Sequence, residues 1–417
     1  VHTRPPQRMT LNLLSPEARV LLLALARTPD ADAIATATGA PAFDWNRLMY
    51  LAEREKATAA VHGMLRAVHA AGPGASPAFA AAVHQLGRMA RVSEFRMLRL
   101  EQLLADVLDI LGAHAIDVVL LKGAGLATTV YGSFAARPMY DLDLLVHPQQ
   151  ATTAWDALRA AGWVHDEVEC PPEFYASHYH LPPLDDPMKT GLAIELHMAP
   201  TDGAVDLSID RVWKSALPVT VLGRRTLVPS PEHQVLHLAT HFAWTHALHS
   251  GAWRTFQDLD RLIAKKDIDW DRVVRAADDA RARTSCYWTF RLARSLASVP
   301  VPDRVLERQR PPRPEWMLDL IERHFTGALF PFGPAVCPSV QITQLLWTVG
   351  MAPRWSGHGA VRPWDRGEVW ALSAGRGPAL PLTARLRGHL TRGAQWGRYA
   401  SALLSPAPVH DRRLHAI

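Results

Sequence analysis

The stretch that decides the fold is Leu120-Leu-Lys-Gly-Ala-Gly125, followed eleven residues later by Arg137-Pro-Met-Tyr-Asp-Leu-Asp-Leu-Leu-Val146. Each part contains an apolar run typical of a buried β-strand, and the second run carries Asp141 and Asp143. Side chains at positions i and i+2 of a strand point to the same face. Two neighbouring carboxylates on a buried strand repel each other and are costly to desolvate. A divalent cation with oxygen ligands is the usual compensation, so the pattern predicts a metal site.

Around this stretch the sequence predicts an α+β fold. Apolar runs place strands at residues 115–121, 141–146, 163–168 and 191–198, with a short helix at 124–131. Helical spacing dominates before and after these strands. We therefore expect a small α/β core flanked by N-terminal and C-terminal helical regions. The expected regions are 1–112 (helical), 113–225 (α/β core), 226–300 (helical, packing on the core) and 301–417 (arginine-rich).

Three sequence blocks resemble a known family. Leu121-Lys122-Gly123, Tyr131, Arg137-Pro138-Met139 and Asp141-Leu142-Asp143 form the first block, Glu195-Leu196-His197 the second, and Pro231-Glu232-His233 the third. In this order they resemble the uncharacterised nucleotidyltransferase family, bacterial proteins of the DNA polymerase β superfamily, over roughly residues 80–265. One departure is that the superfamily's glycine-serine pair is absent: Ala124 follows Gly123, and 17 residues separate Gly123 from Asp141.

The resemblance implies a core that is a mixed sheet with helices packed on one side. It also implies transfer of a nucleotidyl group from a nucleoside triphosphate. Such transfer is an in-line attack on phosphorus that two Mg²⁺ ions can stabilise, and it needs at least two carboxylates and usually a third. Asp141 and Asp143 supply a same-face pair, and we expect Glu195, on a later strand, to be the third. These three residues are therefore the predicted catalytic and metal-binding groups for Mg²⁺ or Mn²⁺.

Four further residues are predicted to contact the nucleotide or support the site. Gly123 would let a phosphate approach the backbone at the start of a helix, and Lys122 would contact the triphosphate as a point charge. Arg137 could clamp a phosphate oxygen, although a salt bridge to Asp141 or Asp143 is the alternative. His197 lies on the same side as Glu195 and could hydrogen-bond a ligand carboxylate.

The remaining histidines favour a supporting role over a zinc site. His233, His237 and His241 share one helix face, but the segment lacks the glutamate that a zinc hydrolase places beside its first histidine. We expect a polar stripe that lines the active-site cleft or packs by hydrogen bonds. His178 or His180 could act as a general base near the acceptor, although an ordinary loop role is the preferred interpretation.

Composition excludes several other classes of protein. The 417 residues are 48% hydrophobic and 20% charged, as in globular chains. No apolar run reaches membrane-spanning length, and the first residues lack a signal-peptide core. The three widely spaced cysteines fit free thiols in a cytoplasmic protein. Residues 301–417 carry 15 arginines, no lysine and 8 acidic residues, a charge of +7, whereas the rest of the chain carries −2. We interpret this arginine-rich composition as a contribution to solubility in preference to nucleic-acid binding.

We therefore expect a cytoplasmic, Mg²⁺-dependent, ATP- or other NTP-binding enzyme. It would transfer a nucleotidyl group, or a related phosphoryl or glycosyl group from an activated nucleotide, to a small-molecule or peptide acceptor. Natural-product tailoring is one setting that the resemblance implies. The alternative is a catalytically inactive nucleotide-binding regulator or antitoxin-like partner.

Overall fold

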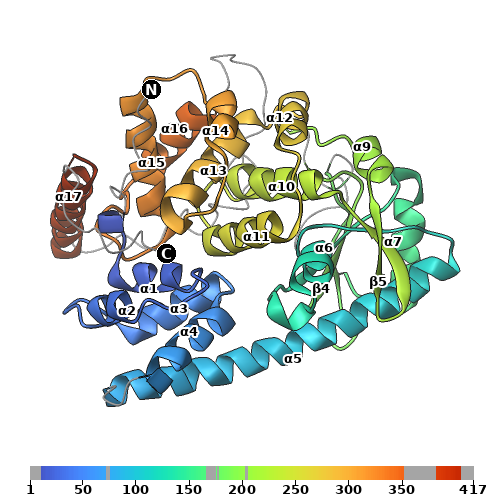
Figure 1. The fold of residues 1–417 in the computed structure, drawn as a ribbon, viewed down its shortest axis with the longest axis horizontal. Coiled ribbons are helices and arrows are strands. Elements are labelled where there is room, and N and C mark those ends of the chain that lie inside the picture. Colours follow the sequence, from blue (N-terminus) through green and yellow to red (C-terminus); the bar gives the residue numbers. More distant parts are fainter. Residues whose placement is uncertain are drawn as a thin grey trace. The chain divides into compact units, whose positions relative to one another are not determined.

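The computed structural model describes residues 11–71, 76–165, 175, 178–201, 205–351 and 382–404. Contacts divide the chain into two compact units (Figure 1). The first unit contains residues 1–83, 241–257 and 283–417, and the second contains residues 84–240 and 258–282. Both units are therefore discontinuous in sequence. The four successive regions expected from the sequence stay a prediction.

All regular secondary structure in the described residues of the first unit is helical. Its helices are α1 (Pro16–Leu23), α2 (Ala31–Thr38), α3 (Trp45–Arg54), α4 (Thr58–Ala71), α13 (Arg283–Ala297), α14 (Asp303–Gln309), α15 (Glu315–Leu329), α16 (Val340–Met351) and α17 (Leu382–Leu404). Polar side chains cap the N-termini of α1 and α2. The Ser15 hydroxyl accepts from the Ala18 N–H, and the Asp30 carboxylate accepts from the Ala33 N–H.

The second unit contains all six strands of the described residues. They are β1 (Val119–Leu120), β2 (Asp141–Leu145), β3 (Leu184–Asp185), β4 (Ala193–His197), β5 (Leu217–Val221) and β6 (Arg224–Val228). The sheet order is β3-β4-β2-β1-β6-β5, with β2/β4 and β1/β6 parallel and the other pairs antiparallel. The expected mixed sheet is therefore confirmed.

Helices of this unit are α5 (Pro77–Ala113, whose first residues belong to the first unit), α6 (Lys122–Leu126), α7 (Ala151–Ala160), α9 (Ile209–Lys214), α10 (Pro231–Thr240) and α12 (Trp270–Asp279). Helix α11 (Ala252–Lys265) crosses the boundary between the two units. A π-helical segment, Ala127–Tyr131, continues α6, and a second one, His241–Thr245, follows α10. None of the described helices has both the length and the apolar character needed to cross a bilayer.

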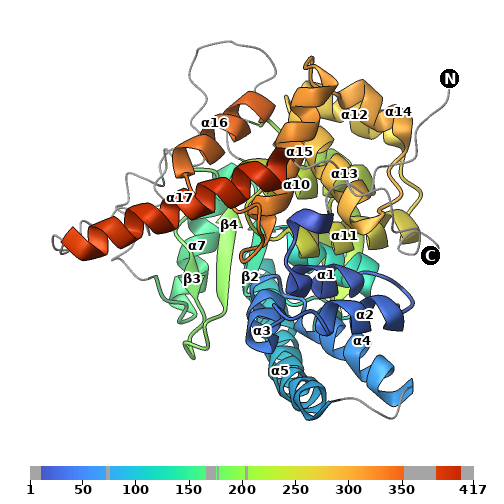
Figure 2. The same cartoon turned by 90° about the vertical axis from the view of Figure 1, so that its left-hand side faces the viewer.

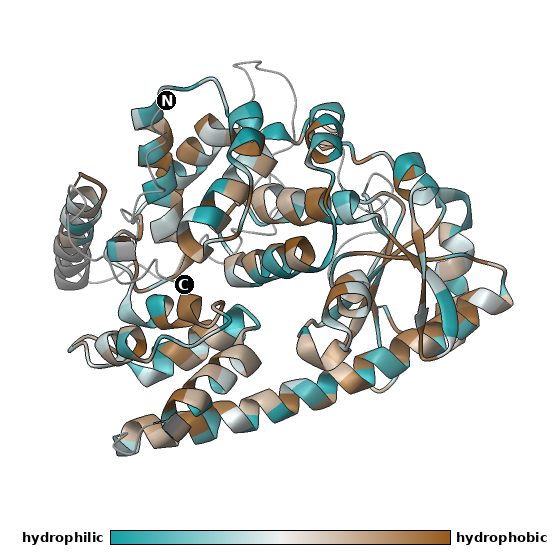
Figure 3. Ribbon diagram, in the orientation of Figure 1, coloured by the Kyte–Doolittle hydropathy of each residue, from teal (hydrophilic) through white to brown (hydrophobic). Residues whose placement is uncertain are grey.

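The main core of the second unit lies on one face of the sheet. Leu142 and Leu144 of β2 and Ile194 and Leu196 of β4 pack there against α5 and α7. Figure 2 shows β2 and β4 with α7 beside them, and Figure 3 shows apolar and polar residues alternating along α5. One face of α5 is thus buried against the sheet while the rest meets solvent.

The opposite face is only partly covered. Its apolar residues, Val119, Leu121 and Leu145, pack against Val212 of α9. Helices therefore lie on both faces, which differs from the expected one-sided packing. The side chains of Asp143, Glu195 and His197 also belong to this face, because strand alternation places them opposite the leucines of the main core.

The structure bears differently on two other sequence expectations: the expected strand is absent from the described part of residues 163–168, whereas the expected free thiols are confirmed for the two described cysteines. Val164 makes only an isolated bridge with Asp185 in place of the expected strand, and residues 166–168 lie outside the described range. Cys286 and Cys337 are free thiols, and Cys170 lies outside the described range.

The close packing of α6 on β1 gives a first prediction. A Cβ atom on the buried Gly125 would lie 2.5 Å from the Leu120 carbonyl oxygen, a backbone atom that cannot move aside cheaply. Gly125→Ala should therefore lower the free energy of unfolding by about 1–3 kcal/mol in urea denaturation. Gly112→Ala is the matched control, because a Cβ there meets nothing within 4 Å and α5 should gain up to about 1 kcal/mol. Equal effects of both changes would contradict the packing argument.

A buried histidine of the first unit gives a second prediction. Burial lowers the pKa of His324 to about 4, and its Nδ1 lies 2.9 Å from the Tyr399 hydroxyl. Unfolded histidine takes up its proton near pH 6.5, so the unfolded state binds more protons between pH 6.5 and 4. The free energy of unfolding should therefore decrease as the pH is lowered from 6.5 to 4. His324→Gln should remove about 2 kcal/mol of the loss between pH 7 and pH 5, measured by urea denaturation; an unchanged pH dependence would contradict the assignment.

Candidate active site

The site lies on the partly covered sheet face, where two parallel strands run side by side. In the β2/β4 register Asp143 lies opposite Glu195, and Leu145 lies opposite His197. Directly paired residues share a face, so the two carboxylates are neighbours. Asp141 is on the same face, opposite Ala193, but it is exposed at the start of β2. The structure thus brings Asp143 and Glu195 together and leaves Asp141 at the rim.

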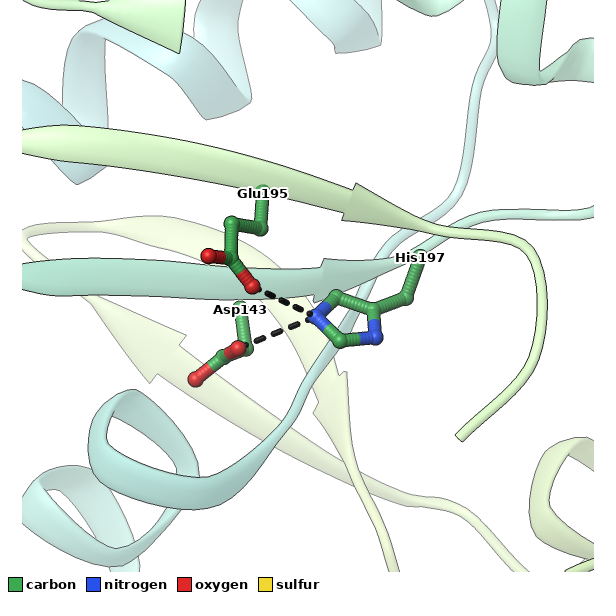
Figure 4. Close-up of side chains that lie close together, drawn as sticks. All are labelled: Asp143, Glu195 and His197. Carbon is green, nitrogen blue, oxygen red and sulfur yellow. Dashed lines mark hydrogen bonds and ion pairs between the residues drawn. The ribbon is translucent and has the colours of Figure 1, made fainter. Parts of the chain in front are cut away.

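His197 joins the two carboxylates. Its Nε2 lies 2.9 Å from Asp143 Oδ1 and 3.4 Å from Glu195 Oε2 (Figure 4). One potential ligand atom from each of these three residues lies within 4.8 Å of the others. Asp143 and His197 are buried, and the Glu195 side chain is 24% exposed. The cluster is therefore reached from the Glu195 side.

Lys122, the first residue of α6, completes the cluster. Its Nζ lies 2.6 Å from Asp143 Oδ1, and the Leu121 N–H donates to the Asp143 carbonyl oxygen at 2.9 Å. Because this hydrogen bond holds Leu121 next to Asp143, the following residue, Lys122, lies beside the Asp143 carboxylate. Lys122 has a φ of 39°, a left-handed conformation that is uncommon for a side chain of this size. Strain of this kind is typical of functional sites.

The electrostatics of the cluster favour charged forms. Burial alone would raise the pKa of the Asp143 carboxyl, but Lys122 and His197 outweigh it and hold the pKa well below its usual value. Burial likewise opposes ionisation of Glu195, yet its pKa is lowered, mainly by the hydrogen bond from His197. Burial would lower the pKa of His197, but its hydrogen bonds to both carboxylates raise it. Both acids are therefore anions at neutral pH.

The donor set fits a divalent cation through its carboxylates. Asp143 and Glu195 supply the hard oxygen ligands that Mg²⁺ or Mn²⁺ prefers, and the rim carboxylate of Asp141 is on the same face. The positive charge that the sequence analysis attributed to a metal is nevertheless supplied in part by Lys122. The predicted metal set and the Lys122–nucleotide contact stay predictions.

Arg137 has a different partner from either of those expected. Its Nε and Nη2 donate to the Asp258 carboxylate of α11 at 3.0 and 2.7 Å, and the Tyr131 hydroxyl donates to the same carboxylate at 2.7 Å. All three side chains are buried. The guanidinium therefore fastens α11 to the segment before β2 instead of forming a salt bridge with Asp141 or Asp143.

Gly123 is explained by the same arrangement. A Cβ atom at this position would collide with the Arg137 guanidinium and would lie 2.8 Å from Met139 Sδ. Gly123 lies inside α6, which begins at Lys122. The glycine thus gives Arg137 and Met139 the room they need, whatever its contact with a nucleotide.

Two of the remaining histidines, His237 and His180, lie near the cluster. His237 is buried on α10, and its pKa falls to about 3 because of burial and the nearby charge of Lys122. His233, on the same helix, is hydrogen-bonded to the hydroxyls of Ser215 and Ser230 at 3.0 and 3.1 Å. His180 bridges to His197 along the strand edge, and its Nε2 lies 2.9 Å from that of His178. Of the two α10 histidines, His237 therefore lies near the site, whereas His233 packs by hydrogen bonds to serine hydroxyls.

Sequence reasoning missed Asp258 and gave no role to Tyr131. The available signal was an acidic residue on the apolar face of α11, among Leu259 and Leu262. A buried carboxylate requires a partner, and the two partners lie more than 100 residues earlier in the chain.

The comparisons with known proteins agree with these motifs. A family model described as "Uncharacterised nucleotidyltransferase" matches residues 41–298, more than half of the chain. No curated protein and no solved structure matches the chain.

The buried Asp258 cluster gives a third prediction. Asp258→Ala would leave the Arg137 guanidinium buried without its anion and should lower the free energy of unfolding by about 3–5 kcal/mol in urea denaturation. Asp109→Ala is the control in the same unit, because the Asp109–Arg224 pair is exposed and should change stability far less. A similar loss for both variants would show that the buried cluster does not fasten α11.

Proposed function

The chain belongs to the uncharacterised nucleotidyltransferase family, and from that premise we propose which reaction it catalyses and with which residues. Family membership makes it a nucleotidyltransferase. The proposal is that it transfers a nucleoside monophosphate from ATP or another NTP to a small-molecule or peptide acceptor. The reaction would depend on Mg²⁺ or Mn²⁺.

One observation supports this proposal above the others: Asp143 and Glu195 lie side by side on parallel strands, with Asp141 on the same face. Both paired acids are ionised at neutral pH, as their lowered pKa values require. When bound, a divalent cation would supply positive charge to the phosphate oxygens and orient the leaving group. The three carboxylates would hold it, and Lys122 would bind the polyphosphate.

The proposed step balances as a substitution at the α-phosphorus. An oxygen or nitrogen of the acceptor forms a bond to the α-phosphorus. The bond between the α-phosphorus and the oxygen that bridges it to the β-phosphorus breaks. Pyrophosphate leaves with the electron pair. Glu195, the partly exposed anion of the cluster, would accept the proton that the acceptor loses.

The acceptor and the transferred group need a direct experiment. A screen of NTPs and nucleotide sugars with Mg²⁺ should release pyrophosphate if a nucleotidyl group moves. Release of a nucleoside diphosphate from an NTP would instead indicate phosphoryl transfer, and its release from a nucleotide sugar would indicate glycosyl transfer. Natural-product tailoring is the setting we propose for such an acceptor.

The carboxylates give a fourth prediction. Asp141→Asn and Asp143→Asn should each lower kcat for Mg²⁺-NTP turnover by at least about 100-fold, because each removes a metal-binding charge. Asp141 is the cleaner test, since its exposed side chain can change without leaving the Lys122 ammonium buried beside a neutral group.

Asp109→Asn is the matched control, because this exposed aspartate lies on α5 and pairs with Arg224. Its turnover should equal that of the wild type, and thermal unfolding should show that all variants fold. Undiminished turnover in the folded Asp141 and Asp143 variants would refute the proposed site. Nucleotide binding by calorimetry without any turnover would instead indicate an inactive nucleotide-binding regulator.

A further inference from the structure

The Lys122 ammonium occupies the position from which a cation would neutralise Asp143. The 2.6 Å ion pair is nearly closed to solvent, since the two side chains are 14% and 4% exposed. Water therefore screens the pair little, and its attraction is stronger than that of a surface pair. A metal ion that binds Asp143 must weaken or replace this contact.

His197 strengthens the same arrangement. Its Nε2 lies near the oxygen of Asp143 that Lys122 contacts, so two donors converge on Oδ1. A histidine that ligates a metal normally donates its other ring N–H to an acceptor. The Nδ1 of His197 is buried and has no hydrogen-bond partner among the described residues. The ring is therefore placed to donate from Nε2 to the carboxylates, and not to bind the metal itself.

Lys122 is the counter-ion of the whole acidic group. Burial would lower the pKa of its ammonium, but Asp143, Glu195, Tyr179 and Asp141 together raise it. All three carboxylates predicted to hold the metal thus already interact with this one lysine. The backbone at Lys122 has a left-handed conformation with φ of 39°, and its side chain reaches Asp143 from there.

We propose that Lys122 is a resident counter-ion that competes with the divalent cation for Asp143, and that the polyphosphate of an incoming nucleotide draws it away. The inference rests on the proposed function, because it names how the same site is regulated. Metal binding would then be weak in the free enzyme and strong only together with the nucleotide.

The chemistry of lysine suits this exchange. Its ammonium is a compact charge on a flexible four-carbon stem, so it can leave a carboxylate for a nearby phosphate without movement of the strands. The phosphate oxygens carry more negative charge than the carboxylate that the lysine leaves. Because binding free energies are coupled reciprocally, the nucleotide and the metal should each increase the affinity for the other.

Lys122→Met tests the competition directly, because methionine keeps most of the stem and removes the charge. Binding of Mn²⁺ alone, without nucleotide, is measured from the electron paramagnetic resonance signal of the free ion. We expect Mn²⁺ to bind Lys122→Met more tightly than the wild type, by a factor on the order of 5- to 150-fold. Lys189→Met is the matched control, because it removes the same charge from an exposed position and should bind Mn²⁺ like the wild type.

Unchanged or weaker Mn²⁺ binding in the folded Lys122→Met variant would overturn the inference, as would an equal gain in Lys189→Met. Thermal unfolding establishes whether the variant folds. If it does not, the wild-type chain provides the test by acetylation of its lysines and mass spectrometry.

In the wild type without metal, Lys122 should be acetylated more slowly than Lys189. Saturating Mn²⁺ should increase the acetylation rate of Lys122 above its own rate without metal. A Lys122 that stays protected with Mn²⁺ bound, or reacts as fast as Lys189 without it, would overturn the inference. These readouts are independent of turnover. If the wild type turns over Mg²⁺-NTP but Lys122→Met does not gain Mn²⁺ affinity, only the counter-ion role is refuted. If Lys122→Met gains Mn²⁺ affinity but the wild type does not turn over Mg²⁺-NTP, only the proposed reaction is refuted.

Discussion

The structure of the second unit depends on neutralising the Asp143 carboxylate. This anion lies within a sheet, and the Lys122 ammonium at 2.6 Å and His197 at 2.9 Å supply the opposite charge and the hydrogen bond that its burial requires. The hydrogen bond from the Leu121 N–H to the Asp143 carbonyl oxygen brings Lys122, the first residue of α6, beside this carboxylate. The Lys122–Asp143 ion pair therefore connects the end of β1 to β2 and also belongs to the polar cluster on the partly covered face.

A second buried ion pair holds neighbouring segments of the same unit together. Arg137 and Tyr131 hold Asp258, so that α11 is fastened to the chain that leads into β2. Gly123 leaves the room that Arg137 and Met139 occupy. The residues of the first motif thus form two groups of contacts. Lys122 and Asp143 belong to the polar cluster on the sheet face, whereas Tyr131, Gly123 and Arg137 meet around Asp258 and Met139. The predicted nucleotide contacts of Gly123 and Arg137 stay predictions.

Two sheet faces with different chemistry explain why the cluster is positioned accurately. Leu142, Leu144, Ile194 and Leu196 anchor β2 and β4 against α5 and α7. A register shift of one residue would move these four aliphatic side chains to the polar face. The buried apolar face therefore determines the register that sets Asp143 beside Glu195. The partly exposed Glu195 side chain then gives the cluster its access to solvent.

The sequence by itself determined the strand that carries Asp141 and Asp143, the mixed-sheet class and the family, because these follow from local alternation and from motif order. Strand alternation also sufficed to place Glu195 and His197 on one side of β4. Only the tertiary structure decided that Asp143 is buried while Asp141 is exposed, that Lys122 neutralises Asp143, and that Arg137 turns to Asp258. The physical reason is that local spacing defines which face a side chain occupies, whereas burial and charge pairing depend on segments that meet only after the chain has folded.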